Sequence, residues 1–422
     1  MEMIKGVINM NNVVEEAKRC LRCKKPMCKS YCPVSTPINE VIDTMFEKGI
    51  YDAGKILFEN NPLSAVCALV CPHEKQCKGN CILGKKSYPI NFGEIEHYIS
   101  LYYLDKLKIE NPIDENKKLA IIGSGPAGIT LAFLLVQKGY DITIFEAHDK
   151  IGGVLRYGIP EFRLPKSILE KMEIKLVEAG VKIRPNTLVG PVITLEDLFR
   201  DGYKAIFIGT GVWNPNKMRI KGETLGNVHY AIDYLKNPEV YRLGKKVCVI
   251  GAGNVAMDVA RTIVRTSSAD VTIMYRKGKE DMPAREHEIE YTHLDGVEFE
   301  FFKSPIEFTS KGVRYEETKY EDVDGEKKFV TIPNSEDFFQ CDSIVVAISQ
   351  GPKANIVSNS KGIEVNKKGL VIVDDCGRTT KEGVFSSGDV VTGAKTVVEA
   401  VKHSKKVAEA IDEYVMDIMS KN

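Results

Sequence analysis

Three zones with different hydrophobic patterns follow one another along the chain. Up to about residue 115, apolar positions recur at helical spacing, as in Asn12 to Leu21 and Pro37 to Phe58, which predicts short helices. The polar, proline-bearing stretch Asn111-Pro-Ile-Asp-Glu-Asn-Lys-Lys is typical of a linker. Beyond it, apolar runs such as Lys118-Leu-Ala-Ile-Ile and Lys246-Val-Cys-Val-Ile alternate with helical segments, the pattern of α/β units built on a parallel sheet.

The composition is that of a folded protein with several domains. The 422 residues are 43% hydrophobic and 27% charged, which suffices for packed cores and gives a prior of roughly three domains. Lys plus Arg and Asp plus Glu number 58 each, so bulk charge indicates neither a nucleic acid nor a membrane as partner. The start, Met1 to Asn9, lacks the apolar core of a signal sequence, and no segment approaches the ~20 apolar residues of a membrane span. We therefore expect a cytoplasmic protein.

Eight of the eleven cysteines lie within the first 81 residues, in two spaced sets. The first set has the spacing C-x2-C-x4-C-x3-C-P, close to that of bacterial ferredoxins, and consists of Cys20, Cys23, Cys28 and Cys32. The second set consists of Cys67, Cys71, Cys77 and Cys81, with Pro72 directly after its second member.

Thiolates at this density suit soft metal ions and predict two [4Fe-4S] clusters. Zinc is one alternative, because C-x2-C also begins many zinc sites, and a disulfide framework of a secreted domain is another. No second C-x2-C or H-x3-H pair completes a zinc set. Iron–sulfur clusters are therefore the favoured interpretation.

A first glycine loop, Gly123-Ser-Gly125-Pro126-Ala127-Gly128, connects a predicted strand, Leu119 to Ile122, with an apolar helix, Ile129 to Gln137. Such glycines permit a tight turn, so that amides at the helix start can bind a pyrophosphate. The next strand ends in Glu146, 23 residues after Gly123, where an acid binds ribose hydroxyls. Strand, helix and acid together predict a dinucleotide site.

A distant sequence identifies that dinucleotide. Gly388-Asp389 follows a strand, and a helix is predicted to begin near Thr396-Val397. This resembles the second FAD motif of flavoproteins with two dinucleotide-binding folds, where the Asp contacts ribityl and pyrophosphate groups, and the helix dipole would stabilise negative charge on the reduced flavin. We expect FAD here, with further contacts from Gly153, Arg156 and Gly211.

A second glycine loop, Gly251-Ala-Gly253-Asn254-Val255-Ala, follows the strand Lys246 to Ile250 and opens the helix Val255 to Val264. The partner strand, Val271 to Tyr275, ends in Arg276-Lys277 rather than in an acid. Cations at this position favour a 2′-phosphate, so NADPH is expected over NADH. The alternative is a solvated basic turn.

A nicotinamide gives up two electrons as hydride and a cubane cluster accepts one, so FAD is the converter between them. Disulfide reductases of this fold release electrons through a cysteine pair near the flavin, but Gly152 to Pro160 contains no cysteine. Cys248, Cys341 and Cys376 are expected to be isolated from each other. The clusters are then the exit for electrons, and no catalytic acid or base is expected.

Five stretches carry a resemblance over nearly the whole chain: Ala17-Lys-Arg-Cys-Leu-Arg-Cys, Asn61-Pro-Leu-Ser-Ala-Val-Cys-Ala-Leu-Val-Cys-Pro, Gly152-Gly-Val-Leu-Arg-Tyr-Gly-Ile-Pro, Gly251-Ala-Gly-Asn-Val-Ala-Met-Asp, and Tyr275-Arg-Lys with Met282-Pro-Ala. The chain resembles the small (β) subunit family of NADPH-dependent glutamate synthase. Its relatives include the amino-terminal half of dihydropyrimidine dehydrogenase and the large subunit of bifurcating NADH-dependent ferredoxin:NADP oxidoreductase.

The resemblance implies cluster ligands. One cubane would be bound by Cys20, Cys23, Cys28 and Cys81, and the other by Cys32, Cys71 and Cys77. The fourth ligand of the other cubane aligns with Glu96, and His97 is its neighbour. From the residues alone Cys67 is the obvious candidate, because thiolate is preferred over carboxylate for iron. A carboxylate ligand would lower the cluster's reduction potential.

The resemblance also implies the architecture and the partner. We expect a helical two-cluster domain over 1–115, a FAD-binding domain over 116–231 plus 351–422, and an inserted NADPH-binding domain over 232–350. The chain is too short for the glutamine-cleaving and 2-oxoglutarate sites, so a larger subunit would supply them. Alternatives are the large subunit of the bifurcating oxidoreductase, whose partner is a smaller flavoprotein or ferredoxin, the input subunit of dihydropyrimidine dehydrogenase, or a scaffold without turnover.

Overall fold

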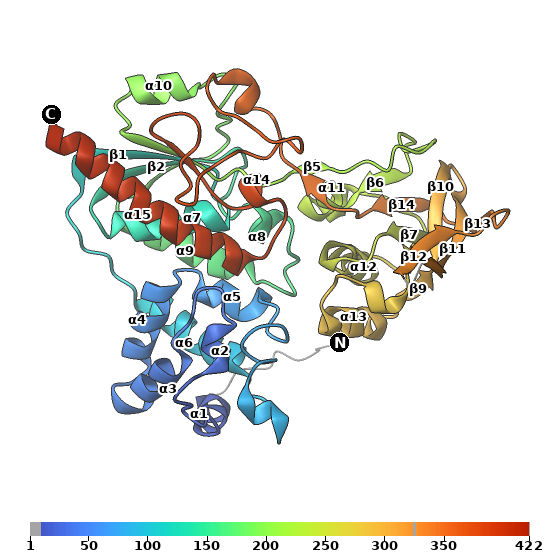
Figure 1. Ribbon diagram of the computed structural model, residues 1–422, viewed down its shortest axis with the longest axis horizontal. Coiled ribbons are helices and arrows are strands. Elements are labelled where there is room, and N and C mark those ends of the chain that lie inside the picture. Colours follow the sequence, from blue (N-terminus) through green and yellow to red (C-terminus); the bar gives the residue numbers. More distant parts are fainter. Residues whose placement is uncertain (1–9, 324–325, 422) are drawn as a thin grey trace. The chain divides into compact units, whose positions relative to one another are not determined.

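The computed structural model describes residues 10–323 and 326–421, and the chain falls into two compact units (Figure 1). The first unit comprises the chain up to Leu155, Glu161–Val212 and the chain from Pro352, and the second comprises Arg156–Pro160 and Trp213–Gly351. The second unit is therefore an insertion in the first. The expectation about a signal sequence concerns residues 1–9, which lie outside the described residues, and the three-domain division stays a prediction.

The first unit begins with a helical region. Its helices are α1 (Met10–Lys18), α2 (Met27–Ser30), α3 (Ile38–Glu47), α4 (Ile50–Asn60), α5 (Ser64–Val70), the 3-10 helix η1 (Ile82–Lys85) and α6 (Phe92–Lys106). The apolar stretch Pro37 to Phe58 forms two helices, because Gly49 between them has φ = +99°, which side chains disfavour. Apolar residues of α1, α3, α4 and α6 form one buried core.

A parallel five-stranded sheet follows, in the order β16-β4-β1-β2-β3. Its strands are β1 (Asp114–Ile122), β2 (Tyr140–Phe145), β3 (Lys182–Arg184), β4 (Ala205–Ile208) and β16 (Val384–Ser386). The associated helices are α7 (Pro126–Val136), α8 (Val154–Tyr157), α9 (Lys166–Glu178), α10 (Leu195–Arg200), η4 (Val357–Asn359), α14 (Asp389–Thr392) and α15 (Val397–Lys421). Helix α15 lies along α7 (Figure 1). The carboxyl ends of β1, β4 and β16 therefore meet at one edge of the sheet.

The expected linker is shorter than its composition indicates. Strand β1 already begins at Asp114, which pairs with Tyr140, and the register then shifts before Lys118 pairs with Asp141. Polar residues 114 to 117 are accommodated because this end of the strand is mostly exposed. The strand was therefore predicted too short, since its exposed end carries no apolar alternation.

The second unit contains its own parallel five-stranded sheet, in the order β6-β14-β7-β8-β9. Its strands are β6 (Val228–Tyr230), β7 (Lys246–Ile250), β8 (Asp270–Tyr275), β9 (Glu298–Phe301) and β14 (Ser343–Val346). The helices are α11 (Ala231–Lys236), η2 (Pro238–Val240), α12 (Asn254–Thr266), η3 (Lys279–Asp281) and α13 (Glu286–Leu294).

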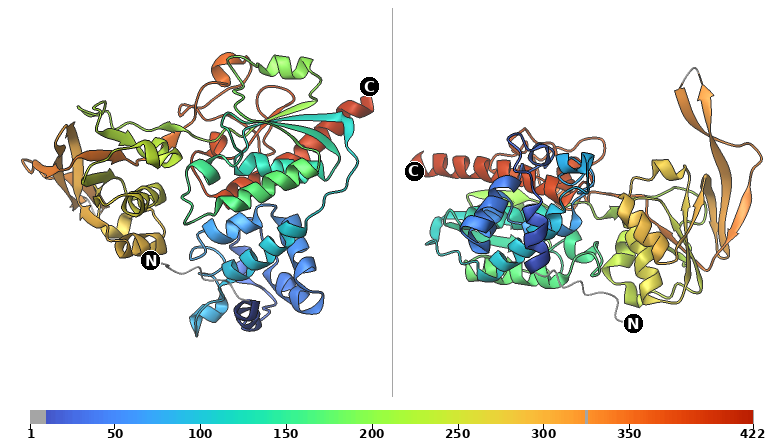
Figure 2. Two further views of the ribbon diagram at one scale, coloured as in Figure 1. Left: turned by 180° about the vertical axis from the view of Figure 1, so that it is seen from behind. Right: turned by 90° about the horizontal axis from the view of Figure 1, so that it is seen from below.

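Antiparallel strands complete the second unit. They are β10 (Lys303–Thr309), β11 (Gly312–Val323), β12 (Glu326–Thr331) and β13 (Asp337–Gln340), with the short pair β5 (Asn214–Pro215) and β15 (Gln350–Gly351). In Figure 2 the ribbon formed by β11 and β12 extends away from the parallel sheet of its own unit.

The expected fold class is confirmed: a helical amino-terminal region precedes two Rossmann-like α/β folds, and the second is inserted in the first. Each sheet places a glycine loop between its central strand and a helix, β1 to α7 in the first and β7 to α12 in the second. Within the part of the chain that the structure describes, no helix combines the length and the apolar character needed to cross a membrane.

Candidate cofactor sites

The first cysteine cavity is lined by thiols from both sequence sets. Its cysteines are Cys20, Cys23, Cys28, Cys77 and Cys81. Most of the remaining lining is apolar, including Ile38, Ile90 and Phe92. Burial raises the pKa of Cys20 and raises that of Cys28 to about 11. These thiols therefore need a positively charged partner in order to ionise, and bound metal supplies one.

The second cysteine cavity brings together Cys32, Cys67, Cys71, Cys77 and Glu96. Glu96 lies on α6 one turn after Phe92 and one turn before Ile99, both of which are buried, so the helix turns this carboxylate inward as well. Glu96 is only 6% exposed. Burial, followed by the negative charge of Cys67, raises the pKa of Glu96 well above its usual value.

The two alternatives to Glu96 differ in their placement. Cys67 lines the second cysteine cavity, so it stays a candidate ligand beside Glu96. His97 is partly buried and is not among the residues that line the cavity, because the next position on a helix points about 100° away. Burial lowers its pKa. Glu96 and Cys67 therefore both line the cavity, and the identity of the fourth ligand stays a prediction.

The donor set fits a multi-iron cluster. All eleven cysteines, each within the described ranges, are free thiols. Within residues 10–323 and 326–421, no three His, Cys, Asp or Glu side chains form a group that could hold a single metal ion. Each of the two cavities is lined by at least four thiols, the number of cysteine ligands that a [4Fe-4S] cluster usually takes.

Sequence reasoning missed several polar residues of the second cysteine cavity. Thr36, Asn61, His73 and Gln76 line it together with the thiols. Thr36 and Asn61 are buried, with exposed fractions of 4% and 2%. Only His73 had a visible signal, since it directly follows Cys71-Pro72. The others are recognisable only once α3, α4 and α5 are packed together.

The first glycine loop is shaped by close backbone contacts. Gly123 has φ = +96°, and a Cβ there would lie 2.7 Å from the carbonyl oxygen of Gly209. A Cβ on Gly128 would collide with the Gly123 carbonyl. At Gly125, in contrast, nothing lies closer than 4.0 Å, so this side of the loop is open. The loop thus has the tight turn and the open middle position that a pyrophosphate needs.

Three further segments meet this loop at the carboxyl edge of the first sheet. A Cβ on Gly153 would lie 2.8 Å from Gly125 Cα, and one on Gly388 would lie 3.2 Å from the Cβ of Ala127. Pro126 is the first residue of α7, as the fixed φ of proline favours. Gly211, with φ = +68°, follows β4 in the segment that contacts Gly123. Arg156 falls in Arg156–Pro160, which groups with the second unit.

Glu146 is buried and already hydrogen-bonded at the end of β2. It accepts bonds from the Ser124 amide at 2.9 Å and from the His148 amide at 2.8 Å. Burial alone would raise the pKa of Glu146, but hydrogen bonds from His148 and Ser124 lower it. Glu146 thus fixes the glycine loop as well as offering an acid at the ribose position.

The start of α15 lies at the second cysteine cavity and close in sequence to Asp389. The amide and hydroxyl of Thr396 donate to Glu399 Oε2 at 3.0 and 2.6 Å, which fixes the first turn that includes Val397. Val398 in that turn lines the second cysteine cavity. The same turn follows Asp389, whose carboxylate accepts a bond from the Lys395 amide at 3.2 Å. The first turn of α15 therefore lines the cavity and is joined to Asp389 through the neighbouring Lys395 amide.

The second glycine loop repeats the same construction. Gly251 has φ = +126°, and a Cβ there would collide with the carbonyl of Ala347, whereas at Gly253 the nearest atom lies 3.9 Å away. The Gly251 amide donates to the Met274 carbonyl at 3.0 Å, which ties the loop to the end of β8. Arg276 and Lys277 follow two and three residues later, exposed and partly exposed respectively. Cations therefore occupy the strand end where an acid would exclude a 2′-phosphate.

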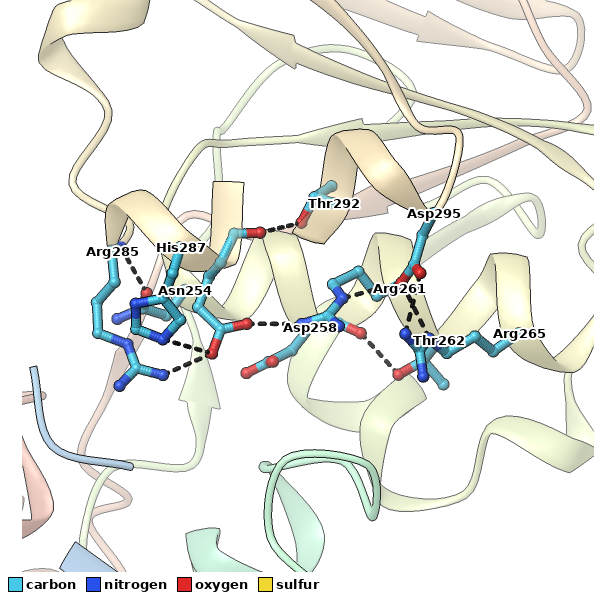
Figure 3. A network of polar contacts seen from close by, with 10 residues as sticks. Asn254, Asp258, Arg261, Thr262, Arg265, Arg285, His287, Thr292 and Asp295 are labelled. Carbon is cyan, nitrogen blue, oxygen red and sulfur yellow. Dashed lines mark hydrogen bonds and ion pairs between the residues drawn. The ribbon is translucent and has the colours of Figure 1, made fainter. Parts of the chain in front are cut away.

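A buried charge network supports this loop from α13 (Figure 3). The Arg285 amide donates to Asn254 Oδ1 at 3.0 Å, next to Val255 at the start of α12. The carboxylate of Glu288 binds the guanidinium groups of Arg285 and Arg261 at 2.5 and 2.7 Å. Because buried charges are costly unless paired, this network fixes α13 against α12.

One expectation about the remaining thiols is wrong. Cys248 on β7 and Cys341 just before β14 are both buried and share a hydrogen bond between their side chains, so they are not isolated from each other. The thiols meet because β7 and β14 are adjacent parallel strands, a pairing that the chain order conceals. Cys376 is exposed.

Comparisons with known proteins agree with this geometry. Residues 117–404 match the family model "Pyridine nucleotide-disulphide oxidoreductase", and residues 1–107 match a dihydropyrimidine dehydrogenase domain II model described as binding a 4Fe-4S cluster. The glutamate synthase [NADPH] small chain of Halomonas elongata is 32% identical over 95% of this chain and 90% of its own length. The glutamate synthase [NADPH] small chain of Escherichia coli is 31% identical over 94% of this chain and 90% of its own length.

Two other similarities are informative. The NAD-dependent dihydropyrimidine dehydrogenase subunit PreT of Escherichia coli is 31% identical over 95% of this chain and 94% of its own length. The solved structure of Mycobacterium tuberculosis FprA in complex with NADPH aligns with a TM-score of 0.62 at 17% identity, over 74% of this chain and 86% of that chain. At this identity the structural likeness shows the fold alone.

Removing Glu96 tests its role in the second cysteine cavity. We expect Glu96→Ala to destroy or convert one of two clusters, because the fourth ligand is lost, so that iron content falls toward about half. Iron analysis and electron paramagnetic resonance (EPR) of the reduced protein measure this. Glu94→Ala, on the exposed face of the same helix, is the matched control and should leave both clusters intact. An intact pair of clusters in Glu96→Ala and a lost cluster in Cys67→Ser would instead assign the ligand to Cys67.

Asp389 makes the stability of the flavin-free protein depend on pH. Burial raises the pKa of Asp389 from 3.8 to about 6. The pKa of Asp389 is higher in the folded than in the unfolded protein. Its contribution to the free energy of unfolding is therefore fully present below the unfolded pKa and is lost as pH rises through about 6. Asp389→Asn should therefore stabilise the flavin-free protein by on the order of 2 kcal/mol at pH 7.5 and by less at pH 5. Urea unfolding at the two pH values measures the difference, and an equal or opposite effect would contradict it.

Proposed function

Because this chain belongs to the glutamate synthase small-chain family of pyridine nucleotide-disulphide oxidoreductases, we propose that it is the electron-input subunit of a glutamate synthase. In this role it takes electrons from NADPH and delivers them, by way of FAD and two [4Fe-4S] clusters, to a larger partner subunit. The observation that carries the proposal is the first turn of α15, which lies against the second cysteine cavity and directly follows the Asp389 segment.

The first unit would hold FAD through its convergent loops. The open face at Gly125 and the amides at the start of α7 would bind the pyrophosphate, while Glu146 and Asp389 would contact ribose and ribityl hydroxyls. Bound FAD would supply the conversion between two-electron hydride transfer and the one-electron chemistry of [4Fe-4S] clusters. The start of α15 would present its positive dipole end to the flavin site, which favours negative charge there.

The second unit would hold NADPH. The open face at Gly253 would admit the pyrophosphate. The buried network of Arg285, Glu288 and Arg261 would stabilise the conformation of the glycine loop. Arg276 and Lys277 would bind the 2′-phosphate. The residues thus supply binding and orientation, and no side chain needs to act as acid or base.

The partner follows from the relatives. Those named glutamate synthase small chains are parts of a two-subunit enzyme by their names, so the proposed acceptor is a large glutamate synthase subunit that carries the glutamine and 2-oxoglutarate sites. The eight clustered thiols also favour a cytoplasmic location, where thiols stay reduced and clusters can be assembled. The similarity to PreT makes a pyrimidine-reducing partner the alternative.

Partner-dependent reoxidation tests the role. The reconstituted chain is reduced with NADPH in an anaerobic stopped-flow instrument and then mixed with a glutamate synthase large subunit, glutamine and 2-oxoglutarate. The proposal requires fast reoxidation of the flavin absorbance in this mixture. Reoxidation by ferredoxin instead, or only in the presence of an FMN-containing dihydropyrimidine dehydrogenase subunit, would assign another partner and contradict the proposal.

The basic pair should decide the choice of nucleotide. We expect Arg276→Ala with Lys277→Ala to weaken NADPH binding about 10- to 100-fold, because charge-assisted contacts to a phosphate are lost, and to leave NADH binding nearly unchanged. Flavin reduction rates at varied nucleotide concentration measure both affinities. Lys279→Ala, an exposed lysine nearby, serves as the control. A similar loss for NADPH and NADH would show that the pair is only a solvated turn.

A further inference from the structure

A path of hydrogen bonds joins one cysteine of the second cavity to the C-terminal helix. Cys32 Sγ lies 3.3 Å from Thr36 Oγ1, and Asn60 Nδ2 donates to the same oxygen at 3.4 Å. Lys405 Nζ donates to Asn60 Oδ1 at 3.3 Å and to the Asn60 carbonyl at 2.7 Å. Cys32, Thr36, Asn60 and Lys405 thus form a continuous chain of polar contacts, here termed the relay.

The relay has a defined direction when Cys32 is ionised. Lys405 can only donate, and Asn60 accepts on its oxygen and donates from its nitrogen. Thr36 accepts the Asn60 N–H and retains one O–H of its own. A thiolate can only accept, so this O–H must donate to Cys32 Sγ. The relay then ends in a hydrogen bond to sulfur at one end and a positive charge at the other.

The surroundings make these contacts effective. Thr36 is only 4% exposed, and Thr36 and Cys32 both line the second cysteine cavity. Lys405 is partly buried on α15, beyond the turn that contains Val398. Burial lowers the pKa of Lys405, while the charges of Glu409 and Cys32 act in the opposite direction, so Lys405 and Cys32 interact electrostatically. Interactions between charges are stronger away from solvent.

We propose that the relay raises the reduction potential of the cluster that Cys32 holds. Because Lys405 lies on α15, this potential then depends on the position of α15 relative to Asn60. The inference rests on the proposed function, because it requires a [4Fe-4S] cluster in the second cysteine cavity. Reduction adds negative charge to a cluster, and both a hydrogen bond to its cysteine sulfur and a nearby cation stabilise that charge. A carboxylate ligand such as Glu96 acts in the opposite direction, so the relay offsets its effect.

Two substitutions test the relay at opposite ends. Thr36→Val removes the hydroxyl at nearly constant shape, and Lys405→Met removes the charge at similar length. Both are measured in the full chain with both clusters, by anaerobic redox titration followed by EPR. We expect each variant to lower the midpoint potential of one and the same cluster and to leave the other cluster unchanged. The double variant should shift it by less than the sum, because both act through one path.

Matched controls separate the relay from general effects of charge and folding. Thr36→Ser keeps the hydroxyl and should keep the potential of the original protein. Lys406→Met removes an equal charge from the adjacent, exposed position and should leave both clusters unchanged. Iron and sulfide content and thermal unfolding show whether each variant is intact. If Thr36→Val loses its cluster, Lys405→Met decides alone, since Lys405 contacts Asn60 and not the cysteine.

The outcomes distinguish the inference from the function on which it rests. Unchanged potentials in Lys405→Met with a full complement of clusters would overturn the relay and leave the proposed function standing. The same would follow if Lys406→Met shifted the potential as much as Lys405→Met. A chain without two clusters before any substitution would overturn the proposed function and the relay together.

Discussion

The first turn of α15 is the constraint that two of the three candidate cofactor sites of the first unit share. Its position is fixed by the bonds between Thr396 and Glu399 and by the packing of the helix along α7. Val398 in this turn lines the second cysteine cavity, while Asp389 lies in the segment just before it. Because a helix is stiff, a shift of this turn would move the residues next to Asp389 and the lining of the cavity together. In the proposed function, one rigid element would therefore set the spacing between the flavin and one cluster.

A buried carboxylate among thiols is the second unusual feature. Glu96 is almost fully buried near Cys67, and burial raises the pKa of this carboxyl well above its usual value. An isolated buried charge costs several kcal/mol, so a site of this kind is unfavourable unless a cation compensates it. Bound iron would supply this positive charge, so that the free energy of cluster binding would offset the cost of burying the carboxylate. The arrangement is understandable as a metal site and is difficult to explain as ordinary core packing.

The sequence revealed the parts of these sites that depend on local chemistry. Glycine loops, cysteine spacing and Arg276-Lys277 are visible because each requires particular residue types at short separations. The start of β1 was misplaced, since its polar, exposed end gives no apolar alternation. The pair Cys248 and Cys341 was missed because it depends on which strands become neighbours. The contact between Asn60 and Lys405 joins residues 345 positions apart, and no pattern along the chain encodes it.

The most direct test of the account is an anaerobic titration of the purified, reconstituted chain with NADPH and then with NADH. Flavin absorbance and the EPR signals of the clusters are recorded together. The account predicts that NADPH bleaches the flavin and that electrons appear on the clusters without any partner protein. Failure of both nucleotides to reduce the flavin, in a chain that contains FAD and two clusters, would contradict it.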